Sequence, residues 1–194
     1  MLILPGSNAL PAFRSQRLLA QLQAIDSNVV EVTGRFDHFV DASTPLDQDD
    51  IGRLNALLTY GDPYAEAEGG EEFIVIPRFG TISPWASKAT DIAHNCGMAH
   101  IKRIERGIAY QVKLKSGLLG GAKKLSDDSV RAIADVLHDR MTETVLRSAE
   151  QAVDLFRELD AKPLASIDLL AGGKGALEQA NTELGLALSD DEID

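Results

Sequence analysis

Two stretches of this sequence have the order strand, helix, strand, and this order limits the folds open to the chain. Residues 1–4 and 29–40 have the pattern of strands, and residues 9–25 between them have helical spacing. Residues 73–76 and 101–114 are again strand-like, with a helix between them. A further helix follows each unit. We therefore expect an α+β fold in which helices cover a sheet, built from two pseudo-duplicated halves without a residue-level repeat.

The chain changes character after its glycine-rich stretch at residues 117–121. Ser126 is a good N-cap for a long helix, because a serine hydroxyl accepts a hydrogen bond from the first turn. Helical spacing continues to about Leu159, and Lys162-Pro163 ends it.

These patterns divide the chain in two. We expect an N-terminal α+β domain over residues 1–148 and a mainly helical linker segment over residues 149–194. The last residues, SDDEID, have the pattern of a helix start with Ser189 as its cap. A cap with little helix behind it favours a chain that is truncated before a further part of a longer protein.

Composition and charge exclude several classes of partner. The net charge of −11 would repel phosphate groups, so we expect no nucleic acid and no anionic membrane surface as a partner. No stretch approaches the ~18 consecutive apolar residues that a membrane-spanning helix needs. The single cysteine cannot form an internal disulfide and suits a reducing compartment, which predicts a cytoplasmic location.

Residues 77–97, PRFGTISPWASKATDIAHNCG, form the densest group of chemically distinctive side chains. Ser83 and Pro84 begin a helix, as N-cap and first helical residue. Helical spacing then puts one set of residues on the inner face, which predicts a buried cysteine and a largely buried tryptophan: Trp85, Ala89, Ile92, Ala93 and Cys96. On spacing alone, the opposite face is a solvated surface with a weak ion pair: Lys88, Asp91 and Asn95.

The sequence contains no recognisable catalytic or metal-binding constellation. The four histidines lack the spacing of metal ligands, and His94 cannot pair with Cys96 because residues two apart on a helix do not face each other. The AGGKG stretch at residues 171–175 satisfies neither the P-loop nor the dinucleotide fingerprint. A plain turn and a nonspecific anion site at Lys174 both stay open for this stretch.

Arg106 breaks the pattern of the strand that carries it. In IKRIERGIAYQVKL the apolar residues alternate along one face, and Arg106 falls in phase with them. Either Arg106 is buried and paired, or Gly107 forms a bulge that turns it outward. Conflicts of this kind are typical of functional or strained sites.

Four blocks resemble one family in the right order: PRFGTISPWASKATDIAHNCG, IERGIAY, LHDRMTETV and IDLLAGGKGALEQANTELGLALSDDEID. The family is the large, single-chain phosphoribosylformylglycinamidine synthase, or FGAR amidotransferase, and the blocks are similar to its N-terminal domain and most of its linker. The chain departs from the family at Ala86, where serine is common, and in the loops at residues 62–71 and 115–125.

The resemblance implies a role in a larger enzyme of purine biosynthesis. The family uses ATP and glutamine to convert formylglycinamide ribonucleotide to formylglycinamidine ribonucleotide. Its ATP and magnesium sites lie in downstream synthetase domains, and its glutaminase triad lies at the far C-terminus. The resemblance therefore implies a chain without cofactor, inactive in isolation, that resembles a fused dimer of the small subunit of split enzymes. Its implied role is to dock the synthetase and glutaminase domains and to help shape the ammonia path.

The matching blocks also suggest which polar residues form the interdomain surface. We expect that surface to include Thr81, Ser83, Lys88, Asp91, His94, Asn95, Arg103, Glu105 and Arg106. Two alternatives belong to other classes of protein. One is an independent nucleotide- or small-anion-binding module that uses AGGKG and Arg106, and the other is a stand-alone Cys/His hydrolase.

Overall fold

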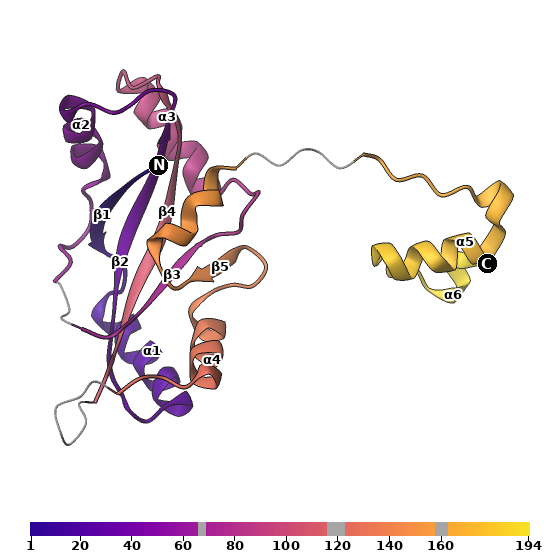
Figure 1. Cartoon of the computed structure of the whole chain (residues 1–194), viewed down its shortest axis with the longest axis horizontal. Helices are drawn as coiled ribbons and strands as arrows, with labels where there is room; N and C mark the ends of the chain where they lie inside the picture. The colour runs from indigo at the N-terminus through magenta and orange to yellow at the C-terminus, as the bar shows by residue number, and fades with distance from the viewer. Residues whose placement is uncertain (66–68, 116–122, 158–162) are drawn as a thin grey trace. The chain divides into compact units, whose positions relative to one another are not determined.

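The computed structural model describes residues 1–65, 69–115, 123–157 and 163–194. Five antiparallel strands form one sheet in the order β1-β2-β4-β3-β5 (Figure 1). The α+β class is therefore confirmed. The elements are β1 (Leu2–Asn8), α1 (Ala12–Ile25), β2 (Val29–Ala42), α2 (Gln48–Leu58), β3 (Glu71–Pro77), α3 (Pro84–Asn95), β4 (Ile101–Leu114), α4 (Asp127–Leu137), β5 (Glu143–Leu146), a 3-10 helix η1 (Ala149–Phe156), α5 (Leu169–Leu184) and α6 (Asp190–Ile193).

The expected duplication is visible in the lengths of the elements. Strands β1 and β3 have 7 residues each, β2 and β4 have 14 each, and α2 and α4 have 11 each. The long strands β2 and β4 pair with each other at the centre of the sheet, and Phe36 lies opposite Ile108 near the middle of both. Each half thus contributes a short strand, a helix, a long strand and a second helix.

Helices cover one face of the sheet as two separate pairs. Helices α1 and α4 pack over one end, where Leu22 and Ile133 are completely buried. Helices α2 and α3 pack over the other end, around Leu54 and Ala93 (Figure 1). The central part of this face, at Phe36 and its neighbours, lies between the two pairs.

The opposite face of the sheet is covered by η1. The segment that leads to η1 differs from the long helix that the sequence predicted. A long helix from Ser126 to about Leu159 was expected, but α4 ends at Leu137. The next segment adds β5 to the free edge of β3, with the β-branched Thr144 and Val145 in its ladder. On this face, Ala152 and Leu155 of η1 pack against apolar side chains of the sheet. Together they form one buried cluster: Phe39, Ile74, Ile76, Ala109, Leu146, Ala152 and Leu155.

The chain divides into two compact units. The described residues before 158 form the first, which therefore includes η1 and extends past the expected boundary at residue 148. The second unit contains α5 and α6. In it Ser189 and Glu192 form a capping box, as expected for a helix start at SDDEID. The expected helix break at Lys162 lies outside the described residues, as do parts of the loops at 62–71 and 115–125.

Gly107 is required by the close approach of β3 to β4. A Cβ atom at this position would lie 2.6 Å from the carbonyl oxygen of Val75 and 2.9 Å from Ile76 Cγ2. We expect Gly107→Ala to lower the free energy of unfolding by about 1–3 kcal/mol, the usual cost of overpacking. Urea denaturation measures this loss. Gly52→Ala is the control, because Gly52 lies on α2 with nothing within 4 Å of its Cβ position, and it should raise stability slightly.

Candidate functional site

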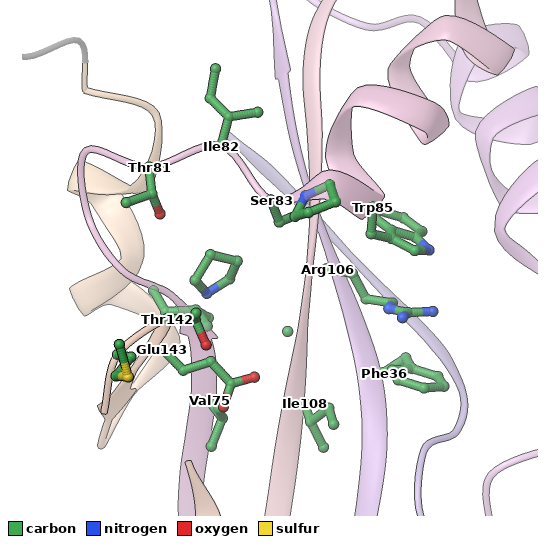
Figure 2. A pocket seen from close by; sticks show the side chains of 15 residues that line it. Phe36, Val75, Thr81, Ile82, Ser83, Trp85, Arg106, Ile108, Thr142 and Glu143 are labelled. Atoms are coloured by element: carbon green, nitrogen blue, oxygen red, sulfur yellow. The ribbon is translucent and has the colours of Figure 1, made fainter. Parts of the chain in front are cut away.

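A shallow groove, called here the central groove, lies on the helix-covered face of the sheet. It consists of two adjoining hollows that share Trp85 and Arg106. The first hollow, of about 440 Å³, is lined by Phe36 and Ile108, which Figure 2 shows beside Arg106, and also by Met141. The second hollow, of about 370 Å³, lies between the C-terminal end of α2 and the exposed side of α3. The groove thus joins the middle of the sheet to the α2–α3 pair.

Arg106 lies at the point where the two hollows meet. The ladder between β2 and β4 is regular here, with Arg106 opposite His38, so no bulge turns the side chain outward. Of the two alternatives from the sequence, the bulge is wrong, and the buried, paired arginine is only partly met: Arg106 is half-buried, with aromatic rings beside it and a hydroxyl as its hydrogen-bond acceptor. Its guanidinium carbon lies 4.4 Å from the ring centre of Phe36 and 4.8 Å from that of Trp85, and Figure 2 shows the side chain between these rings. Such cation–π contacts contribute about 0.5–2 kcal/mol each.

Tyr60 and His38 extend this cluster beneath the groove. Arg106 Nη1 donates a hydrogen bond to the Tyr60 hydroxyl at 3.2 Å, and His38 Nε2 lies 2.8 Å from the same hydroxyl. The His38 ring is completely buried, and this burial, with a smaller contribution from the charge of Arg106, lowers the pKa of His38 to about 4. His38 is therefore neutral at pH 7 and adds no second charge beside Arg106.

The inner face of α3 differs from the face expected from apolar spacing. Its buried residues are Ala86, Thr90 and Ala93, whereas Trp85 is half-buried and Ile92 is 40% exposed. The reason is that α3 packs against β4 beyond the end of β3, where β4 has free backbone groups. Thr90 Oγ1 accepts a hydrogen bond from the backbone N–H of Ile104 at 3.1 Å, so a polar residue occupies the inner face.

Cys96 is exposed, which corrects the expectation that it is buried. It is the C-cap of α3 and lies outside the rotated inner face. We expect the native protein to react with a thiol reagent such as Ellman's reagent at nearly the rate of the urea-unfolded chain. The absorbance of the released thiolate measures both rates. Slow labelling that becomes fast only in urea would contradict the exposed position.

Three of the expected interface residues form a buried polar contact instead of an exposed surface. Glu105 is completely buried, and its carboxylate accepts hydrogen bonds from the backbone N–H and the hydroxyl of Ser83 at 3.1 and 2.6 Å. Arg103 Nε lies 3.3 Å from the same carboxylate, and Arg103 Nη2 donates to the carbonyl of Leu155 at 2.7 Å. These residues tie the start of α3 to β4 and η1.

The other expected residues have separate positions. Lys88 lines the second hollow, and Thr81 lines the first, where its hydroxyl donates to the carbonyl of Arg78. His94 Nε2 lies 2.7 Å from the carbonyl oxygen of Ile101. Asp91 and Asn95 are exposed on α3. No ion pair joins Lys88 to Asp91 in the described part of the chain.

Sequence reasoning missed two groups of the central groove. Tyr60 follows α2 in a connecting segment, and Met141 precedes β5, so neither belongs to a periodic pattern that points to the groove. Phe36 shares its strand face with other apolar residues and carries no separate signal. Arg106 is marked in the sequence as a charge within an apolar face, and the dense stretch at residues 77–97 supplies Thr81, Trp85 and Lys88.

The glycine-rich stretch at residues 171–175 does not fit a phosphate site. It lies within α5, with a kink at Gly173, and the Asp168 carboxylate already caps the helix by accepting from the backbone N–H of Ala171. The ammonium group of Lys174 contacts the carboxylate of Asp194. Across the described ranges, no three acidic, histidine or cysteine side chains come together as metal ligands would.

A family model for the N-terminal part of formylglycinamide ribonucleotide amidotransferase matches residues 35–156, which is more than half of the chain. The chain belongs to this family. The match runs from within β2 to the end of η1. It includes every residue that lines the two hollows of the central groove, among them Phe36, Tyr60, Trp85 and Met141. FGAR amidotransferase is a multidomain enzyme of purine biosynthesis, so this fold forms one part of a larger protein. Among the described residues, no helix is both long and apolar enough to cross a membrane.

Proposed function

We propose that this chain is a noncatalytic N-terminal module of FGAR amidotransferase, and that the central groove docks other domains of the enzyme. The observation that carries the proposal is the open groove with a half-buried arginine at its centre. The opposite face of the same sheet is already covered by η1. Exposed apolar side chains surround the groove, with Ile82 62% exposed, Met141 82% and Ile92 40%. Apolar surface of this kind is typical of an interaction site.

The partners that we propose are the synthetase and glutaminase domains of the enzyme. ATP and Mg²⁺ would bind to the synthetase domains and not to this chain, and the glutaminase would supply the ammonia. In this arrangement the module positions the synthetase and glutaminase domains relative to each other and helps to shape the ammonia path. The isolated chain should then form no product from formylglycinamide ribonucleotide, with either glutamine or ammonia as nitrogen donor.

Arg106→Ala in the full-length enzyme tests the docking role. We expect glutamine-dependent turnover to fall at least about tenfold, because a desolvated charge in an interface is costly to remove. The same substitution should lower the unfolding free energy of the isolated chain by no more than about 4 kcal/mol, the upper value of its two cation–π contacts together. Steady-state kinetics and urea denaturation give the two numbers.

Arg53→Ala is the matched control, because Arg53 is an exposed arginine of α2 with a surface ion pair to Asp49. It should leave turnover unchanged, since surface ion pairs contribute little. If Arg106→Ala destabilised the isolated chain strongly and left full-length turnover intact, Arg106 would be a structural residue and the docking proposal would be wrong.

A further inference from the structure

We infer that Arg106 receives a side-chain carboxylate of the docked polypeptide, and that the two hollows hold the apolar side chains on either side of that carboxylate. This inference rests on the proposed docking function and specifies the chemistry of the segment that docks. It makes the central groove selective for a segment with an acidic residue between two apolar ones.

Arg106 differs from the other half-buried arginines of the described residues in having no carboxylate partner. Arg35 Nε lies 2.8 Å from an oxygen of Asp37, and Arg103 Nε lies 3.3 Å from an oxygen of Glu105. Arg106 has only the neutral Tyr60 hydroxyl as a hydrogen-bond acceptor in the described part of the chain. The chain has 30 acidic and 19 basic residues, so the missing partner does not reflect a shortage of carboxylates.

The surroundings of the guanidinium leave one direction for a partner. The rings of Phe36 and Trp85 lie on either side of the group (Figure 2). Its Nη1 atom already donates a hydrogen bond to the Tyr60 hydroxyl. A new acceptor must therefore approach in the plane of the group, where paired N–H donors fit the two oxygens of a carboxylate. The stacked rings hold this plane fixed, so less side-chain entropy is lost when the carboxylate binds.

The walls of the hollows favour a polypeptide as the source of the carboxylate. The second hollow is lined mainly by apolar side chains, among them Leu57, Leu58 and Ile92, with Lys88 as a second cation. The first hollow offers Val75 and other apolar groups on the far side of Arg106. The exposed apolar side chains around both hollows extend beyond the reach of a small carboxylate, whereas a peptide segment would cover them.

Trp85 provides a direct test, because it is the only tryptophan of the chain and stacks on Arg106. We would titrate the protein with two blocked peptides, acetyl-Leu-Glu-Leu-amide and acetyl-Leu-Gln-Leu-amide, and follow the fluorescence of Trp85. The glutamate peptide should give a saturable change and bind at least about tenfold more tightly than its glutamine isostere. In Arg106→Gln this preference should fall to less than about twofold.

Control variants keep the test decisive. Arg53→Gln should retain the full preference for the glutamate peptide, and Arg106→Lys should retain only part of it, because lysine cannot form the paired contact. Equal binding of the two peptides, binding of neither, or an unchanged preference in Arg106→Gln would overturn the inference. Acetate binding as tightly as the glutamate peptide would overturn the polypeptide source. None of these results would alter the kinetic test of docking, so the two ideas can fail separately.

Discussion

Glu105→Ala should lower the free energy of unfolding by about 3–5 kcal/mol, the usual cost of removing one member of a buried charge pair. The carboxylate is completely buried and accepts hydrogen bonds from the backbone N–H and the hydroxyl of Ser83, and Arg103 Nε lies 3.3 Å away in an ion pair. Alanine would leave the two donors of Ser83 without this acceptor and the charge of Arg103 without its carboxylate. It would also remove the contact that ties the start of α3 to β4.

Urea denaturation of the isolated chain measures this loss. Glu105→Gln keeps the shape and one acceptor oxygen, so it should lose less than Glu105→Ala. Asp91→Ala is the control, because Asp91 is an exposed carboxylate on α3, and its removal should change stability by less than about 0.5 kcal/mol. A loss below about 1 kcal/mol for Glu105→Ala would contradict the structural role of this carboxylate.

His38 should make the protein sensitive to acid. The pKa of His38 is about 4 in the folded chain, against about 6.5 in an unfolded one, because burial disfavours the charged ring. Between these pH values the unfolded chain binds more protons, so the free energy of unfolding rises with pH there. As the pH falls from 6.5 to 4, the protein should lose up to about 3 kcal/mol of stability through His38 alone.

Burial is the main reason why protonation of His38 is unfavourable, and it outweighs the backbone of Leu4, which raises the pKa of the ring. The Tyr60 hydroxyl lies 2.8 Å from Nε2, and that hydroxyl already accepts a hydrogen bond from the positively charged Arg106. A second positive charge on His38 would therefore be unfavourable next to the groove. The aromatic rings of Trp85 and Tyr60 pack against the imidazole and keep water away from it.

The measurement is the unfolding free energy at several pH values between 4 and 7, for the natural protein and for His38→Gln. Glutamine does not titrate, so the variant should lose less stability on acidification, and the difference between the two curves should grow toward pH 4. Acidic residues common to both proteins contribute equally and cancel in the difference. Parallel curves would contradict a buried neutral His38.

The repeated strand–helix–strand order predicted the α+β class, the two halves and the bounds of β4, because long strands and amphipathic helices have strong periodic signals. The same alternation marked Arg106 as a charge on an apolar face. These predictions depended only on residues that are neighbours within one helix or strand. The spacing of apolar residues along the sequence is enough to identify such neighbours.

The misses came from contacts between residues far apart in the sequence. The inner face of α3 is set by Thr90, which satisfies the free N–H of Ile104 on β4, and apolar spacing gives no sign of this. Glu105 was expected on an exposed surface, but its partner Ser83 lies on another element. Tyr60 belongs to a connecting segment, so its place beneath Arg106 depends on how α2 packs on the sheet.

Photo-crosslinking in the full-length enzyme tests the central claim most directly. A benzoylphenylalanine residue at position 92 would lie beside the second hollow, where Ile92 is 40% exposed. The same residue at position 153 would lie on η1, which covers the other face of the sheet, where Val153 is 70% exposed. The account predicts crosslinks from position 92 to the synthetase or glutaminase domains and few from position 153. Efficient crosslinks from position 153, with none from position 92, would contradict docking through the central groove.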